Sequence, residues 1–360
     1  EDFSEIFIDL EARENEKIVT HETENKKKEQ LIKLRDLLYG GLTSLAQYPT
    51  EYHHTLEEYK KRIESYNYSV IQVGDVPIDV ASEIFTRVNV GGKPLTLFEI
   101  MVAKTYDYDK NFDLSEKFDL LVNTLKDVNY ETISNATILQ IASLILAKEC
   151  KRKIILNLNK EEFIELWEQV VDAIERSVDY FKSYYRIPVS QLLPYNALIV
   201  PFAYFFYHHK DKPTGDKQKY LQDFFWRVAL SGRYSSAVES KLAQDIKRID
   251  KILSNALPEY DWPINASPVF IKGNGRFSAG RSYIKAILCI YAHFQPKSFA
   301  DDSLVNISND WLKQANSKNY HHFFPKAYLR KLNKDEREIN HILNITIVDD
   351  FLNKRKIKDN

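Results

Sequence analysis

Cysteine is scarce in this sequence. The 360 residues include only two cysteines, Cys150 and Cys289, which lie far apart and outside any Cys-X-X-Cys pattern. This distribution excludes a zinc site built from several thiolates and is typical of proteins of the reducing cytoplasm. Glycine and proline are also infrequent, with 10 and 12 residues, which argues against a disordered or linker-rich protein. We therefore expect a folded, cytoplasmic protein.

Long hydrophobic runs are missing as well. The longest, residues 195–207, has 13 residues and includes Pro201. A membrane-spanning helix needs about 20 apolar residues, so we expect no membrane partner. The same run is apolar on all sides of a helix, which predicts a buried helix. With 44% hydrophobic residues the chain can bury sizeable cores, and its length predicts two or three domains.

The charge is nearly balanced overall but unevenly distributed. The formal net charge is −1, which neither favours nor excludes nucleic acid. From Lys313 to the end there are eleven lysines and arginines against six acidic residues, whereas the first thirty residues carry ten acids and five bases. A basic C-terminal part suits a phosphate-rich partner such as double-stranded DNA, although a solvated surface has the same composition.

The hydrophobic pattern predicts a mainly α, multidomain chain. Residues 1–110 combine a strand-like alternation, "SEIFIDL", with helices over residues 26–38 and 56–65, and Thr96 with Glu99 predicts a capping box. Apolar residues at three- and four-residue spacing predict a helical scaffold over residues 111–257. Three prolines in residues 258–268 then mark the start of a last domain, residues 258–360.

Two polar segments on these helices leave alternatives open. "RYSS", residues 233–236, could contact phosphate, but a structural arginine at a helix start is the preferred interpretation. Arg87 and Asn89 stand at a helix end beside Gly91-Gly92, where free backbone N–H groups suit an anion or nucleotide. A plain joint between two helices explains that second pattern equally well.

The stretch "NYHHFFPKAYL", residues 319–329, carries the sharpest candidate site. His321 and His322 could be packed or surface residues, zinc ligands, or a catalytic base. No third soft ligand stands nearby, which disfavours zinc. Neighbouring strand residues point to opposite faces, so at most one histidine can play a given role.

The residues after the histidine pair favour a catalytic role. A β-branched strand with Asn344 follows, and then a helix start with Asn353. Histidine, strand and helix in this order are typical of a ββα-metal nuclease site. A neutral imidazole can take a proton from water at physiological pH, and an asparagine oxygen is a suitable ligand for Mg²⁺.

Two segments carry a family resemblance: "EIFTRVNVGGKPLTLFEIMVAKTY" (residues 83–106) and "HHFFPKAYL" with "ILNITIVDDFLNKRKI" (residues 321–329 and 342–357). They resemble the GmrSD-type modification-dependent restriction nucleases, which join an N-terminal ParB-like domain to a C-terminal HNH domain. The resemblance implies a partial α+β ParB-like region in residues 1–110 and a ββα-metal (HNH) fold in residues 258–360. The family's Asp-Gly-Gln-Gln-Arg motif does not occur here. We expect it upstream of Glu1, in a longer parent protein.

The resemblance also implies a function and a site. It predicts a Mg²⁺- or Mn²⁺-dependent endonuclease that cuts foreign, modified DNA in anti-phage defence, with nucleotide hydrolysis only in the full-length protein. His322 is the general base and Asn344 braces the loop of the catalytic site. Asn353 binds the metal with His321, which replaces the family's acidic ligand. DNA phosphates are expected to contact Lys326, Arg330, Lys331, Lys354, Arg355 and Lys356.

Two further expectations accompany this prediction. A homo-oligomer is compatible with the sequence. The alternative function, favoured by the histidine at position 321 and by the missing upstream motif, is a non-catalytic helical module. Its degenerate HNH domain would bind only DNA or a partner subunit.

Overall fold

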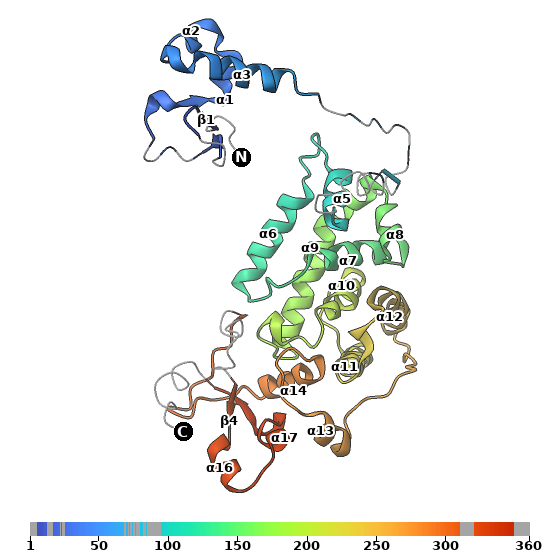
Figure 1. Ribbon diagram of the computed structural model, residues 1–360. Coiled ribbons are helices and arrows are strands. Elements are labelled where there is room, and N and C mark those ends of the chain that lie inside the picture. The colour runs from blue at the N-terminus through green and yellow to red at the C-terminus, as the bar shows by residue number, and fades with distance from the viewer. Residues whose placement is uncertain are drawn as a thin grey trace. The chain divides into compact units, whose positions relative to one another are not determined.

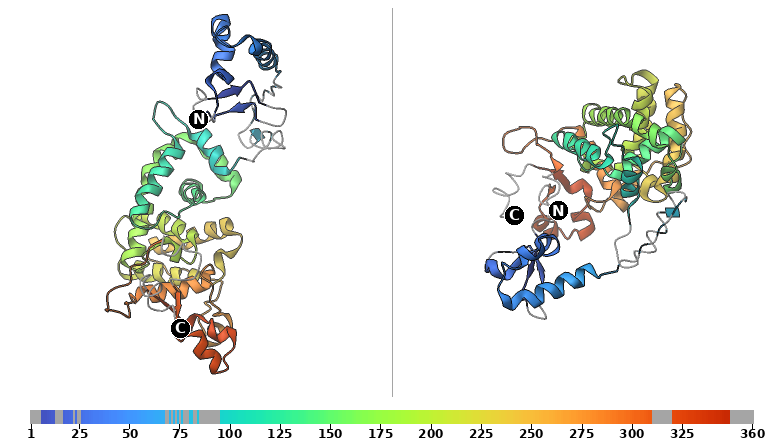
Figure 2. Two further views of the ribbon diagram at one scale, coloured as in Figure 1. Left: turned by 60° about the vertical axis from the view of Figure 1, so that its left-hand side comes forward. Right: turned by 90° about the horizontal axis from the view of Figure 1, so that it is seen from above.

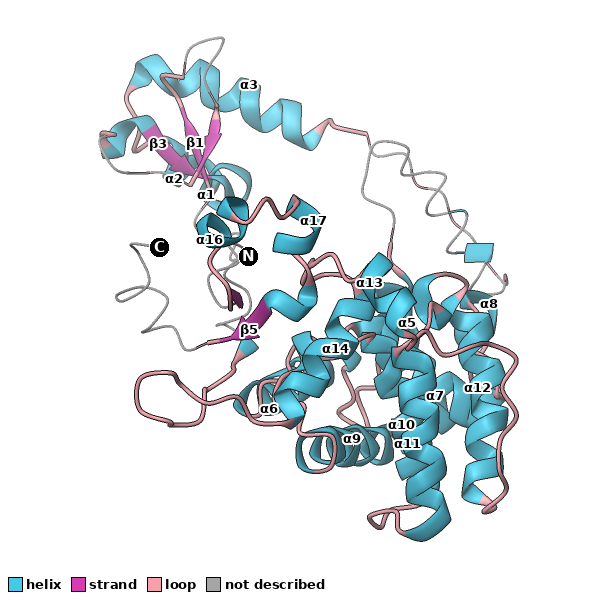
Figure 3. Cartoon of the chain, turned by 90° about the horizontal axis from the view of Figure 1, so that it is seen from below, coloured by secondary structure: helices cyan, strands magenta, loops and turns pink. Residues whose placement is uncertain are grey.

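The structure, a computed structural model of the chain, is mainly helical with two small sheets (Figures 1 and 3). It describes residues 6–12, 17–21, 26–67, 95–309 and 320–348, with the single positions 23, 70, 72, 74, 76, 80, 81 and 84. The chain divides into two compact units, Glu1–Asp75 and Val76–Asn360. Among the residues so described, no helix is long and apolar enough to cross a membrane.

The first unit is an α+β fold around a small apolar core. Its antiparallel sheet has the strand order β2-β1-β3, and Ile8 of β1 pairs with Ile32 of β3. The strands are β1 (Phe7–Asp9), β2 (Val19–Thr20) and β3 (Leu31–Lys33). The helices are α1 (Leu34–Tyr39), α2 (Gly41–Leu45) and α3 (His53–Glu64), with the 3₁₀ turns η2 (Lys28–Gln30) and η3 (Thr50–Tyr52). The strand predicted within "SEIFIDL" is confirmed, whereas the helix predicted over residues 26–38 is wrong, because residues 31–33 form β3.

The second unit is built around a bundle of packed helices. The apolar helix α10 is buried as predicted and packs against α7, α9 and α12, and Figure 2 shows these green and yellow helices side by side. The bundle helices are α5 (Leu97–Thr105), α6 (Leu114–Asp127), α7 (Asn135–Ala147), α8 (Arg152–Leu156), α9 (Lys160–Ser183), α10 (Ile199–His208), α11 (Gly215–Ala229) and α12 (Val238–Leu253). The short turns are η4 (Ser190–Leu192), η5 (Asn196–Leu198) and η6 (Arg233–Ser235).

The second unit continues through its C-terminal part. Its helices are α13 (Pro268–Asn274), α14 (Ser282–His293), α16 (Lys326–Lys331) and α17 (Glu336–Ile339). The strands are β4 (Tyr320–His322) and β5 (Ile345–Ile347), with the turn η7 (Ile342–Asn344) before β5. β4 and β5 pair antiparallel, with His321 opposite Thr346 and His322 opposite Ile345. The strands predicted at the histidine pair and after Asn344 are therefore present as an antiparallel pair. The helix predicted after them falls in residues 349–360, outside the described residues.

The division of the structure differs from the predicted boundaries. Helix α5 begins at the predicted capping box, in which Glu99 N donates to Thr96 Oγ1 over 3.2 Å, and it packs on α6 and α9. The region predicted as a ParB-like domain over residues 1–110 is thus split between the two units. At the other end, Ile284 of α14 and Ile345 of β5 belong to the same buried cluster as the bundle. Residues 95–309 and 320–348 share one core, because apolar side chains that precede residue 257 in the sequence pack against apolar side chains that follow it.

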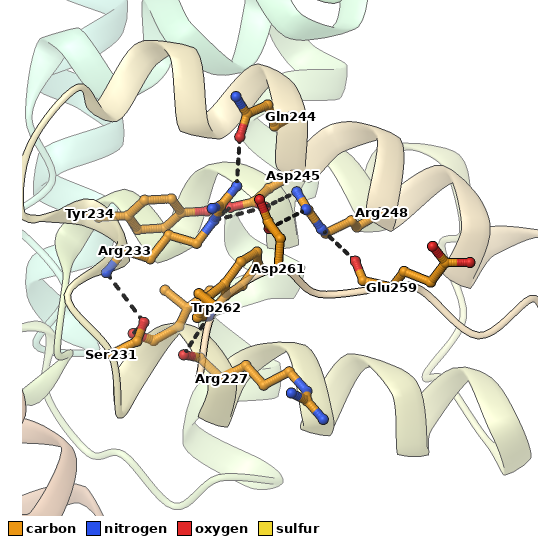
Figure 4. Close-up of polar contacts among 11 residues, drawn as sticks. Arg227, Ser231, Arg233, Tyr234, Gln244, Asp245, Arg248, Glu259, Asp261 and Trp262 are labelled. Carbon is orange, nitrogen blue, oxygen red and sulfur yellow. Dashed lines mark hydrogen bonds and ion pairs between the residues drawn. The ribbon is translucent and has the colours of Figure 1, made fainter. Parts of the chain in front are cut away.

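A buried ion network fastens the segment after α12 to the bundle (Figure 4). Asp245 is fully buried and accepts hydrogen bonds from Arg233 Nε (2.8 Å), Arg248 Nη1 (3.1 Å) and Tyr234 Oη (2.8 Å). The guanidinium groups of Arg233 and Arg248 lie over the Trp262 ring, 3.7 and 4.7 Å from its centroid. Arg233 is therefore a structural arginine, as preferred from the sequence, but it lies in η6, before the start of α12.

Candidate functional site

His322 ends β4 in a half-buried position. Its Nε2 lies within hydrogen-bonding distance, 3.0 Å, of Oδ1 of Asn340. The two residues are 18 positions apart in the sequence. Burial lowers the pKa of His322, and nearby Lys326 and His321 lower it further, while the Asn340 hydrogen bond and Glu336 oppose this shift. The lowered pKa favours the neutral imidazole, which is the protonation state that a general base needs.

Asn344 fixes the backbone that follows His322. Its Oδ1 accepts a hydrogen bond from Phe324 N (2.8 Å), and its Nδ2 donates to Phe324 O (3.2 Å) and Ile339 O (3.0 Å). The Asn344 carbonyl also accepts from Phe323 N (2.9 Å). The side chain is buried and all three of its bonds go to backbone groups, so this geometry is the one that a loop-bracing residue requires.

Asn340 and Glu336 were not identified from the sequence. Asn340 Nδ2 donates to Glu336 Oε2 and to the Glu336 carbonyl, each over 2.9 Å. Arg330 in turn binds Glu336 Oε1 through Nε (2.9 Å) and Nη2 (2.8 Å). The four-residue spacing of Glu336 and Asn340 is a helical signal, but nothing in the sequence links it to His322.

The predicted metal ligands are only partly within the described residues. His321 lies opposite Thr346, on the face of the sheet away from Ile345 and Ile347, and Asn353 lies outside the described residues. In the described part of the chain, no group of three or more His, Cys, Asp or Glu residues could hold a metal ion. His321 supplies a single nitrogen donor, so these residues alone do not complete a site for Mg²⁺ or Mn²⁺, which prefer several oxygen ligands.

The predicted DNA contacts are likewise partly visible. Lys326, Arg330 and Lys331 lie on the exposed surface of α16, beside the exposed rings of Phe323 and Phe324. Lys326 is near enough to lower the pKa of His322, whereas Arg330 holds Glu336. The remaining predicted contacts, Lys354, Arg355 and Lys356, and the proposed nucleotide residues Arg87 and Asn89, lie outside the described residues.

Comparison with known proteins adds one distant relative. No family model matches the chain. The uncharacterized protein MJ0686 of Methanocaldococcus jannaschii is 24% identical over 357 residues, which cover 90% of this chain and 58% of that protein. The chain thus spans less than two thirds of the length of this relative.

Proposed function

We propose that this chain is a divalent-metal-dependent endonuclease that hydrolyses phosphodiester bonds of double-stranded DNA, with His322 as the general base. The observation that carries the proposal is the pair of hydrogen bonds between the Asn344 side chain and the backbone of Phe324. Phe324 lies two positions after the half-buried His322, which ends one strand of an antiparallel pair. These bonds fix the backbone that follows His322, and the contact of its Nε2 with Asn340 Oδ1 holds the imidazole, as a residue that transfers a proton in catalysis requires.

The chemistry follows from the residues around His322. The neutral imidazole removes a proton from water, the resulting hydroxide attacks phosphorus, and the bond from phosphorus to the leaving oxygen breaks. The leaving oxygen takes a proton from solvent water, and the imidazolium returns its proton to solvent. The ammonium group of Lys326 lies near enough to attract the phosphate. His321 and Asn353 would hold a Mg²⁺ or Mn²⁺ ion, which when bound neutralises negative charge on the scissile phosphate and leaving oxygen.

The resemblance to GmrSD-type nucleases supports a biological role. We propose that the substrate is foreign, modified DNA and that the activity serves anti-phage defence in the cytoplasm. Nucleotide hydrolysis belongs, on this proposal, to the full-length protein.

The deciding experiment is cleavage of plasmid and phage DNA with Mg²⁺ or Mn²⁺. His322→Ala should lose on the order of a hundredfold or more of the rate, as expected for a general base. His54→Ala, at an exposed position of α3, is the matched control and should cut like wild type. A wild-type protein that binds DNA but cuts none with either metal would instead identify the non-catalytic binding module.

A further inference from the structure

We infer that Asn340 and Glu336 are positioning residues that hold His322 in the tautomer required of the base. This inference rests on the proposed nuclease function. It concerns a chain of side-chain contacts from Arg330 through Glu336 and Asn340 to His322. None of these contacts is needed to build β4 or β5, whose pairing is made by backbone groups.

Asn340 is itself held from several directions. Its carbonyl accepts a hydrogen bond from Phe277 N over 2.8 Å, and its N–H donates to the Glu336 carbonyl over 3.2 Å. Its Nδ2 has two acceptors on Glu336, the carbonyl oxygen and Oε2. A flipped amide would turn Oδ1 toward these two acceptors and lose both hydrogen bonds, so the network orients Oδ1 toward His322.

This orientation selects one tautomer of the imidazole. Asn340 Oδ1 can only accept, so Nε2 of His322 must carry the proton, which leaves the lone pair on Nδ1. Nδ1 is then the atom that receives the proton from water. In the imidazolium that results, the Nε2–H bond to Asn340 is retained, so the side chain keeps its place through the reaction.

Glu336 and Arg330 complete the arrangement. Arg330 occupies Oε1 of Glu336 with two nitrogens, so Oε2 remains directed at Asn340. Arg330, predicted as a DNA contact, is therefore assigned to positioning the site.

The tautomer can be measured without any cleavage assay. We would record ¹⁵N and ¹³C NMR shifts of His322 in the metal-free protein at mildly alkaline pH, where the ring is neutral. Wild type should show the Nε2–H form. Asn340→Leu, which presents no acceptor, should show both tautomers, whereas the control Glu338→Gln should retain Nε2–H, because Glu338 pairs with Lys334 instead. An Nδ1–H form in wild type would overturn the inference, and this result needs no variant to fold.

Kinetics provide the second test. Asn340→Leu and Glu336→Gln should lower kcat roughly tenfold to hundredfold, the usual effect of residues that orient a catalytic group, with little change in KM for DNA. Glu338→Gln is the matched control, because this exposed carboxylate of the same helix pairs with Lys334 instead. Unchanged kcat in Asn340→Leu would overturn the inference, whereas a wild type that cuts no DNA would overturn only the proposed nuclease.

Discussion

The side-chain amide of Asn344 binds both backbone groups of Phe324, with Oδ1 2.8 Å from its N–H and Nδ2 3.2 Å from its carbonyl oxygen. Phe324 lies two positions beyond His322 and opens the turn that leads into α16. One buried side chain thus ties the strand that carries the proposed base to the residues just before β5.

Replacing Asn344 should therefore affect stability directly. Asn344→Ala leaves the Ile339 carbonyl without its buried hydrogen bond and removes two part-buried bonds to the Phe324 backbone, and the unsatisfied buried carbonyl should cost about 1–3 kcal/mol. We expect a clearly lower Tm in thermal unfolding monitored by circular dichroism. Asn306→Ala, at an exposed position, serves as the control. Equal melting temperatures for Asn344→Ala and wild type would exclude the bracing role.

Gly275 should tolerate no side chain. A Cβ atom there would collide with the imidazole of His341 and lie 2.7 Å from the carbonyl oxygen of Ile271. Gly275→Ala should destabilise the protein by about 1–3 kcal/mol, as is usual for overpacking. Gly273→Ala is the matched control, because a Cβ at this position of α13 meets no atom within 4 Å. A denaturation midpoint for Gly275→Ala as high as that of Gly273→Ala would contradict the collision.

The buried carboxylate of Asp245 should be essential to the bundle. Asp245→Asn removes the negative charge that Arg233 and Arg248 share, leaving a buried guanidinium uncompensated at a cost of about 3–5 kcal/mol. Asp261 also pairs with Arg248, but its side chain is 75% exposed, so Asp261→Asn should cost less than about 1 kcal/mol. Urea unfolding of the two variants measures the difference. Similar losses would mean that burial does not control the strength of this network.

His208 should make stability depend on pH. Burial and Lys148 lower the pKa of His208, with Asp250 opposing them. The unfolded chain, with an ordinary histidine pKa near 6.5, then binds more protons than the folded one, and stability falls as pH drops below about 6.5. Between about pH 7 and pH 5, the unfolding free energy should fall more steeply for wild type than for His208→Phe, which keeps a ring without the proton. Parallel curves would show that His208 does not contribute.

DNA binding by this chain should be weak and independent of sequence. Contacts from Lys326 and Lys331 would go to phosphates and carry no base readout. In mobility-shift titrations from about 50 to about 200 mM salt, affinity should drop by roughly a thousandfold if six or more phosphates are contacted. Lys326→Ala should weaken binding to plain and modified duplexes equally, while Lys251→Ala on α12 should not. Strong discrimination between the two duplexes would place a sensor of modified bases within this chain.

Local patterns predicted the helical elements well. The buried helix α10 and the capping box of α5 depend on neighbouring residues, so spacing along the chain was sufficient to find them. The strand β3 was missed because its conformation depends on pairing with β1, and residues 26–38 carry enough helix-forming side chains to suggest otherwise. Pairing between distant segments overrides local preference here.

In the predicted site, too, features that depend on neighbouring residues could be predicted, and contacts between distant residues could not. The strand that contains Ile345 and the position of Asn344 beside it could be inferred from β-branched residues and the order of motifs. The contact of His322 with Asn340 could not, because it joins positions 18 residues apart, with the two short helices α16 and α17 between them. Residues on both sides of the predicted boundary at residue 258 lie in one compact unit, also through contacts between distant segments. The guanidinium groups of Arg233 and Arg248 lie over the ring of Trp262, an interaction that a proline-rich segment does not reveal.

The shared core of α14 and β5 bears on how such a protein could have evolved. Ile342 N donates to Gly275 O over 2.7 Å, Tyr291 Oη donates to the Ile342 carbonyl over 3.2 Å, and Ile345 is buried in the cluster that holds Ile284. A segment that shares its buried core with the helical bundle cannot be exchanged as an independent domain. Cut out at residue 258, it would expose its apolar side to water, and the remaining helices would lose part of their packing surface. Recombination that swapped this portion between lineages would also have to exchange the residues of α11 and η4 against which α14 packs.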